Sequence, residues 1–175
     1  MFENISPVWL IVFGMLLCLI LVFIFRKINT LLTQLFKPFK KGQTYWCKVI
    51  AVSDGDTLTC SRLNFRRSQT KIRFAYIDAP ESSQSYGRES QKIVQKMVYQ
   101  KIVRIQITDT DRYGRHVGVI YRIYKNVNKE LVKHGAAWVY EDYIKDKKHR
   151  EHWLQLQNKA KKQKKGLWKS SYPVR

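Results

Sequence analysis

The feature that most constrains this 175-residue chain is an uncharged apolar run over residues 8–25. A helix of that length is roughly 27 Å long, close to the thickness of the hydrocarbon layer of a bilayer. The run has no polar face, which argues against a buried core helix. A cleavable signal peptide is also disfavoured, because residues 1–7 hold Glu3 but no Lys or Arg, and no small-residue cleavage site follows. We therefore predict an uncleaved transmembrane anchor over residues 1–25.

Basic residues follow the apolar run directly. We interpret residues 26–43 as a basic juxtamembrane linker, which could equally lie on anionic lipid. By the positive-inside rule, these charges place the rest of the chain on the cytoplasmic side of a single-pass membrane protein. The charged side chains concerned are Arg26, Lys27, Lys37, Lys40 and Lys41.

The remainder of the chain is strongly basic. The whole sequence holds 33 Lys and Arg against 13 Asp and Glu, which gives a net charge of +20. A partner rich in negative charge is therefore expected. Of three cysteines, only Cys47 and Cys60 lie outside the apolar run, so a disulfide scaffold is excluded. These two could pair across the first hairpin, but two buried thiols are the favoured interpretation.

The soluble part reads as an α+β domain over residues 44–169, followed by a tail at 170–175. Extended segments are expected on both sides of an Asp-Gly turn within residues 45–61, and at 71–77, 103–108 and 117–124. Helical spacing and glycine stops predict helices at 87–101, 128–134 and 142–165. Five short strands and three helices favour a five-stranded OB-type β-barrel, preceded by the transmembrane helix.

Acidic residues are scarce in this domain, and six of them form three tight pairs. The pairs are Asp54 with Asp56, Asp78 with Glu81, and Asp109 with Asp111. Clustered carboxylates repel one another unless a cation lies between them, and oxygen ligands suit calcium or magnesium. Each pair also has a purely structural explanation, as turn residues or as acids in the first turn of a helix.

Two arginines, Arg73 and Arg115, lie close to these acids in the sequence. A guanidinium group can hold a phosphate through paired hydrogen bonds, so the combination favours chemistry on a phosphodiester. Arg73 and Asp78 are five residues apart and would point to opposite faces of a flat strand. A bend between them is required if both belong to one site.

Four motifs in order resemble the micrococcal or staphylococcal nuclease (thermonuclease) family, over residues 45 to 168. They are SDGDT at 53–57, IRFAYIDAPE at 72–81, DRYGR at 111–115 and VNKELV at 127–132. The closing KGLW at 165–168 is also similar. The resemblance implies a calcium-dependent endonuclease that cleaves DNA and RNA with little base specificity.

The resemblance also implies a role for each matching position. Asp56, Asp78 and the backbone carbonyl of Ala79 would bind Ca²⁺, and Glu81 would act on the attacking water. This family often has threonine where Ala79 stands, a change of little consequence if only the carbonyl is used.

The two arginines, Arg73 and Arg115, would bind the phosphate and stabilise the charge that develops on it. Tyr113 would pack against the nucleotide. Tyr140 and Tyr143 are candidates for base stacking, although a core or rim position suits each of them equally.

Two other functions stay open from the sequence: a non-catalytic, membrane-tethered nucleic-acid-binding domain of the OB type, and a scaffold that grips anionic lipid. No protein partner is evident, and we expect a monomer. The location of the domain is also open, because calcium is scarce in cytosol while the charge rule points inward.

Overall fold

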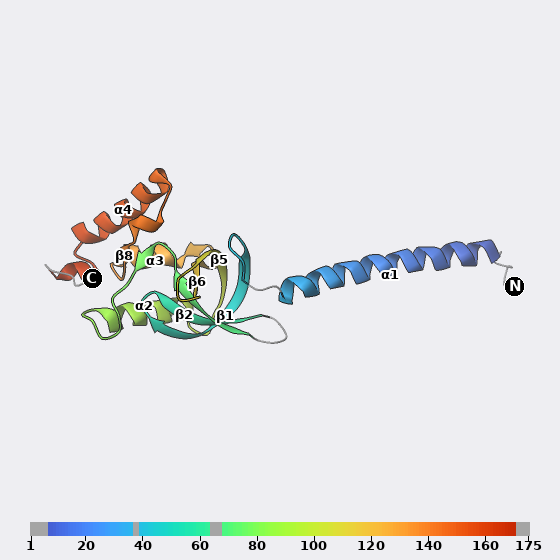
Figure 1. Ribbon diagram of the computed structural model, residues 1–175, viewed down its shortest axis with the longest axis horizontal. Coiled ribbons are helices and arrows are strands. Elements are labelled where there is room, and N and C mark those ends of the chain that lie inside the picture. Colours follow the sequence, from blue (N-terminus) through green and yellow to red (C-terminus); the bar gives the residue numbers. More distant parts are fainter. Residues whose placement is uncertain (1–6, 37–38, 64–67, 171–175) are drawn as a thin grey trace. The chain divides into compact units, whose positions relative to one another are not determined.

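A computed structural model describes residues 7–36, 39–63 and 68–170 of the chain (Figure 1). It divides into two compact units, one up to residue 38 and one from residue 39 on. Parts of the expected anchor (residues 1–6), linker (37–38) and tail (171–175) lie outside the described residues.

The first unit holds one long helix, α1 (Pro7–Phe36). The predicted apolar helix is therefore present, and it continues past residue 25 through Arg26 and Lys27. The stretch Ile11–Thr30 is exposed along its whole length, and its length and composition would let it cross a membrane. A signal sequence has the same character, so this observation does not choose between anchor and signal.

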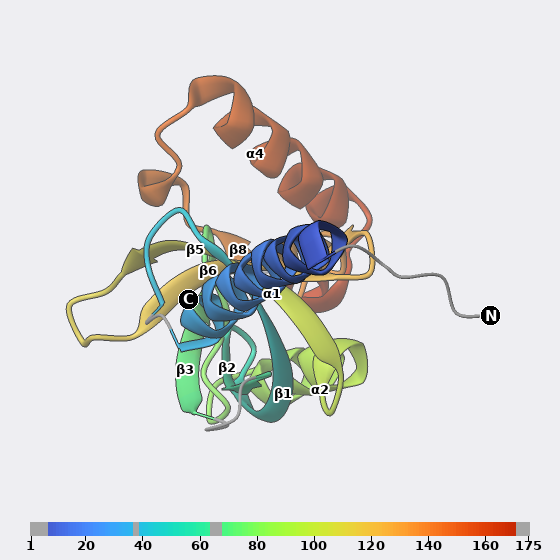
Figure 2. The same ribbon diagram turned by 90° about the vertical axis from the view of Figure 1, so that its right-hand side faces the viewer.

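The second unit is built on the closed five-stranded barrel that the sequence predicted (Figures 1 and 2). Neighbouring strands are antiparallel in the order β3-β2-β1-β5-β6, and a parallel pairing of β3 with β6 closes the barrel. The strands are β1 (Thr44–Asp54), β2 (Thr57–Arg62), β3 (Gln69–Phe74), β5 (Ile102–Thr110) and β6 (His116–Arg122).

Three two-residue strands were not predicted, because so short a segment carries no period that a sequence can show. β7 (Lys125–Asn126) extends the barrel sheet beside β6. β4 (Ile77–Asp78) pairs with β8 (Trp138–Val139) in a small separate sheet. This small sheet fixes the backbone of Asp78, one of the predicted site residues.

The three predicted helices are confirmed as α2 (Gly87–Val98), α3 (Val127–Lys133) and α4 (Lys147–Lys162). α2 packs on β1, while α3 packs on β6 and on α4. α4 begins later than predicted, because the Asp146 side chain accepts a hydrogen bond from His149 N (2.6 Å) and caps it. Two 3₁₀ turns, η1 (Glu141–Tyr143) and η2 (Gly166–Lys169), flank it.

The core fills the barrel with alternate residues of its strands and continues under the helices. Cys47 and Cys60 are free thiols buried in this core, as the sequence favoured. Asn128 is a fully buried polar side chain that accepts from Ile120 N (3.0 Å) and donates to Ala75 O (2.9 Å). It therefore fixes α3 to β6 and to the segment that leads into β4.

Candidate active site

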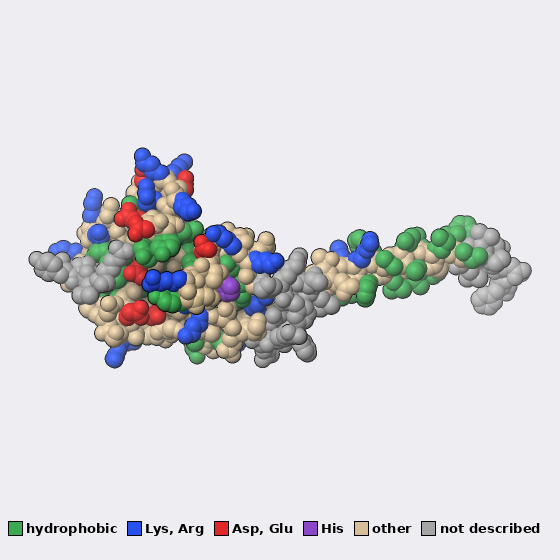
Figure 3. Space-filling model, in the orientation of Figure 1, with side chains coloured by type: hydrophobic (Ala, Val, Ile, Leu, Met, Phe, Trp, Pro, Cys, Tyr) green, Lys and Arg blue, Asp and Glu red, His purple; other side chains and the backbone are tan. Residues whose placement is uncertain are grey.

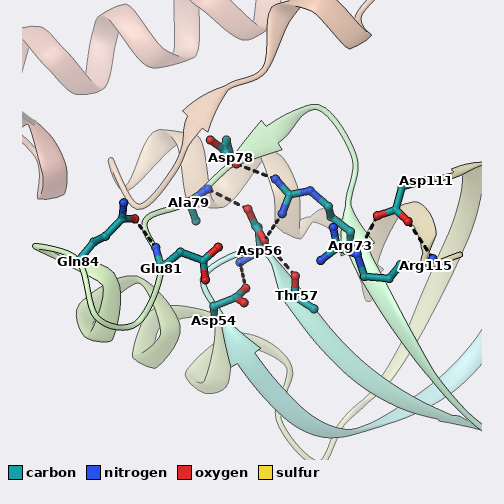
Figure 4. Close-up of polar contacts among 10 residues, drawn as sticks. All are labelled: Asp54, Asp56, Thr57, Arg73, Asp78, Ala79, Glu81, Gln84, Asp111 and Arg115. Carbon is teal, nitrogen blue, oxygen red and sulfur yellow. Dashed lines mark hydrogen bonds and ion pairs between the residues drawn. The ribbon is translucent and has the colours of Figure 1, made fainter. Parts of the chain in front are cut away.

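Arg73, near the end of β3, holds two carboxylates together. Its Nη1 lies 2.9 Å from Asp56 Oδ1, and its Nη2 lies 2.6 Å from Asp78 Oδ1 (Figure 4). The required bend is present: β3 ends at Phe74, and Tyr76 has a φ of 67° before β4 begins. A residue other than glycine rarely adopts this conformation, and here it turns Asp78 back toward Arg73.

Asp56, in the turn between β1 and β2, is the most buried acid of the site, with 3% of its surface exposed. Its Oδ1 accepts from Thr57 Oγ1 (3.0 Å), and its Oδ2 accepts from Ala79 N (2.9 Å). Burial raises the pKa of Asp56 to about 7, although the Arg73 charge acts in the opposite direction. An additional cation next to this carboxylate would stabilise its charged form, which burial disfavours.

Gly55 allows the turn to approach so closely. A Cβ atom at this position would lie 2.1 Å from Ser90 Oγ and 2.7 Å from the Ala79 Cβ. Any larger residue would push the turn away from Ala79. The turn glycine therefore brings Asp56 against the segment that carries Asp78 and Ala79.

These groups fit a hard divalent cation in their chemistry. Asp56 and Asp78 supply carboxylate oxygens within reach of one guanidinium, and the adjacent Ala79 can add a backbone carbonyl. Among the described residues, no group of three or more His, Cys, Asp or Glu side chains is arranged to hold a metal. A metal here would have to complete its coordination with backbone oxygen, water and substrate.

Glu81 follows β4 in an exposed segment. Its backbone N–H donates to Gln84 Oε1 (2.6 Å), which fixes the start of the turn before α2. In Figure 4 its carboxylate points toward Asp54 and Asp56, on the far side of Arg73 from Arg115. The acids of the predicted site therefore gather on one side of the Arg73 guanidinium.

Arg115 is positioned by Asp111 at the turn between β5 and β6. Asp111 Oδ1 accepts from Tyr113 N (3.0 Å) and Arg115 N (2.9 Å), and its Oδ2 lies 2.7 Å from Arg115 Nε (Figure 4). Burial acts to raise the pKa of Asp111, but the hydrogen bonds from Arg115 and Tyr113 outweigh it and lower that pKa. Asp111 is thus a positioning residue, which its acidic pairing with Asp109 did not indicate.

A cleft of about 890 Å³ connects the remaining predicted residues. Tyr113 is 68% exposed and lies beneath the Arg115 guanidinium at 5.4 Å. Tyr140 and Tyr143 pack edge to face at 4.6 Å. The predicted residues on the cleft wall are Arg73, Arg115, Tyr113, Tyr140 and Tyr143.

The wall of this cleft also includes residues that the sequence did not single out as site residues. Lys41, Arg112, Lys145 and His149 all line it. Isolated lysines and arginines cannot be distinguished by pattern in so basic a chain. Figure 3 shows Lys and Arg side chains spread over one face of the domain. The cleft itself is lined by basic residues that include Arg73, Arg112 and Arg115, a lining suited to a polyanion.

Comparisons with known proteins agree with this geometry. A sequence model of staphylococcal nuclease homologues matches residues 71–170. An "uncharacterized endonuclease" of Haemophilus influenzae is 43% identical over 128 residues, which cover 73% of this chain and 68% of that protein. An "uncharacterized endonuclease" of Escherichia coli is 41% identical over 128 residues, which cover 73% of this chain and 79% of that protein. The micrococcal nuclease of Shigella flexneri is 30% identical over 130 residues, which cover 69% of this chain and 72% of that protein. The chain belongs to the staphylococcal nuclease family.

Proposed function

We propose that the protein is a calcium-dependent endonuclease that hydrolyses phosphodiester bonds of DNA and RNA with little base specificity. The observation that carries this proposal is the shared cleft of Arg73 and Arg115, with Arg73 joined to Asp56 and Asp78. Family membership and the net charge of +20 support the same conclusion. Contacts through phosphate rather than base edges account for the weak selectivity.

The two arginines are proposed to bind the scissile phosphate and to stabilise the transition state. Asp111 engages Arg115 through Nε, so Nη1 and Nη2 can donate to two oxygens of one phosphate. Arg73 is held by its two carboxylates at the boundary between the cleft and the acids. Negative charge that grows on the phosphate during attack is stabilised by donors already in place.

The acids on the other side of Arg73 are proposed to provide the cation site and the base. Asp56, Asp78 and the Ala79 carbonyl would bind Ca²⁺, which neutralises charge on the phosphate when it is bound. Glu81 is proposed to accept a proton from the attacking water. The raised pKa of Asp56 supports this assignment, because a buried carboxylate of this kind is costly without a further cation.

We further propose that α1 anchors the enzyme in a membrane as a single pass, with the nuclease domain on the cytoplasmic side and no protein partner. The exposed apolar surface of residues 11–25, and Arg26 and Lys27 directly after it, support this proposal. The alternative to the enzyme is a tethered nucleic-acid-binding domain without catalysis. The cleavage experiment described next separates this alternative from the endonuclease.

The test is a calcium titration of cleavage, with labelled single-stranded and double-stranded DNA and with RNA. We expect Arg115→Ala and Glu81→Gln each to reduce turnover at least about a hundredfold with the fold intact, the scale of one lost transition-state stabiliser. Arg88→Ala and Glu89→Gln, both exposed on α2, are matched controls that should cleave like the wild type. Near-normal rates in both site variants would refute the assignment, and binding without cleavage at any calcium level would favour the alternative.

A further inference from the structure

The segment just before β1, residues 39–43, is fixed to the barrel by its backbone. Gly42 N donates to Ile107 O (2.8 Å), and Ile107 N donates to Gln43 O (2.9 Å). These two hydrogen bonds continue the pairing of β1 with β5 to the residues just before the start of β1. Lys41, directly before Gly42, therefore has a defined backbone position on the domain.

Aromatic packing holds the start of the same segment. The Phe39 ring lies 4.6 Å from that of Tyr45 and 5.0 Å from that of His116. The Arg62 guanidinium lies over both Phe39 (5.0 Å) and Tyr45 (4.8 Å). Cation–π contacts of this kind add to the two backbone hydrogen bonds in fixing the segment.

Lys41 extends from this fixed segment into the wall of the catalytic cleft, where it meets an acid. Its Nζ lies 2.9 Å from Asp109 Oδ2, and the two side chains are 69% and 62% exposed. A pair this exposed is weak, because water screens both charges. A stronger or more highly charged anion can therefore replace the carboxylate.

A second lysine, Lys145, belongs to the same end of the cleft. It lies between η1 and α4 and lines the cleft together with Lys41 and Asp109. The pKa of Asp109 is lowered mainly by the hydrogen bond from Lys41, and the Lys145 charge contributes in the same direction. Two lysines from distant parts of the chain thus act on one carboxylate.

We propose that Lys41 and Lys145 form a second phosphate-binding subsite, which takes a phosphodiester of the bound strand other than the one being cut. In the absence of a strand Asp109 occupies the subsite, and it competes with the incoming phosphate. The inference rests on the proposed function for its ligand, a nucleic-acid strand. The concave wall shared with Arg73 and Arg115 suits a strand that runs along the cleft rather than a flat lipid surface.

Binding without cleavage tests the subsite. The full chain in zwitterionic detergent is titrated, with EDTA present, into a fluorescent single strand about twelve nucleotides long, within the range of site sizes for such clefts. We expect Lys41→Gln and Lys145→Gln each to weaken binding about three- to tenfold and to reduce the salt dependence of log Kd by about 0.7, the contribution of one phosphate contact. Asp109→Asn should tighten binding by removing the competing anion.

Two controls isolate the subsite from general charge effects. Lys125→Gln removes the same charge from β7, outside the cleft wall, and should change binding less than either cleft variant. A dinucleoside monophosphate has a single phosphodiester and cannot fill both subsites, so when the arginines hold that phosphodiester its binding should be the same for wild type and for Lys41→Gln.

Several outcomes would overturn the inference. One is equal loss of binding in Lys125→Gln and Lys41→Gln, and another is no loss in either cleft variant. A third is a Lys41→Gln variant that binds the strand like the wild type and loses affinity only when anionic lipid vesicles replace the strand in the titration, which would assign the lysine to lipid. Failure of the proposed function is distinct from all of these, because the strand would then bind through the subsite but would not be cut when calcium is added.

Discussion

Asn128 shows how a single buried side chain positions the acids without touching them. Its amide oxygen accepts from Ile120 N, and its amide nitrogen donates to Ala75 O (2.9 Å) and to Gly118 O (3.2 Å). Ala75 N in turn donates to Gly118 O (2.8 Å), where β3 closes on β6. The side chain thus stabilises the bend through which the chain returns from Arg73 to Asp78.

We predict that Asn128→Ala destabilises the domain by roughly 2 to 4 kcal/mol, because one buried N–H loses its acceptor and two carbonyls lose a donor. Unfolding by urea, followed by circular dichroism of the full chain in detergent, measures the change. Asn158→Ala, at an exposed position of α4, is the matched control and should leave the unfolding free energy nearly unchanged. A small effect of Asn128→Ala would show that the bend is held by other contacts.

The paired acids and the family resemblance predicted Arg73, Asp56 and Asp78 as one site. Side chains alternate between the two faces of a strand, and this rule predicted the bend between Arg73 and Asp78, which are five residues apart. The sequence did not predict that Asn128 stabilises this bend or that Asp111 positions Arg115. An asparagine in a helix or an acid in a turn is common, and only the fold shows which backbone groups it meets.

At the scale of elements, the segment after α3 and the start of η2 meet at two glycines. Gly135 has a φ of 65°, and a Cβ there would lie 2.2 Å from Lys165 O. Gly166 has a φ of 54°, and a Cβ there would lie 2.3 Å from Gly135 O. Leu167 N donates to the same carbonyl at 2.8 Å. This contact fixes the C-terminal end of α4 to α3.

We predict that Gly135→Ala destabilises the domain by roughly 2 to 4 kcal/mol, because strain at positive φ adds to a clash with a backbone carbonyl. The same unfolding measurement gives the value. Gly42→Ala is the control, since its φ is 80° but a Cβ there would meet nothing within 4 Å. It should cost only the conformational strain, about 1 kcal/mol. Equal losses in the two variants would show that the contact itself adds nothing.

Sequence reasoning located the two glycines as helix stops, since glycine commonly ends a helix. It did not show that they lie against each other, because α4 separates them in the chain and the contact is a tertiary one. It also placed the start of α4 too early: residues 142–146 follow a helix-like pattern, yet Asp146 is the cap. A cap competes locally with the continuation of a helix, and here the Asp146 side chain accepts from His149 N and sets the start of α4.

At the scale of the whole molecule, the chain combines an apolar helix with a basic nuclease domain. Every described side chain from Ile11 to Thr30 is exposed. A surface of this kind is unfavourable in water and needs either a bilayer or removal by cleavage. The seven residues before the apolar run hold no Lys or Arg, which favours the bilayer over cleavage.

We predict that the protein stays in the membrane fraction after alkaline carbonate extraction and that its mass is that of the uncut chain. Replacing Leu17 and Ile20 with arginine should release it, because each charge costs roughly 3 kcal/mol at the centre of a membrane helix. Replacing the same two residues with phenylalanine keeps the segment apolar and should retain the protein in the membrane.

The same preparations determine on which side of the membrane the domain lies. Arg26 and Lys27 follow the apolar stretch, so protease added outside intact cells should leave the domain whole until the membrane is opened. A soluble product that lacks the apolar segment would contradict the anchor and identify it as a signal sequence. An uncut, membrane-bound chain with an accessible domain would contradict only the orientation, and would expose the proposed calcium ligands to a compartment where calcium is plentiful.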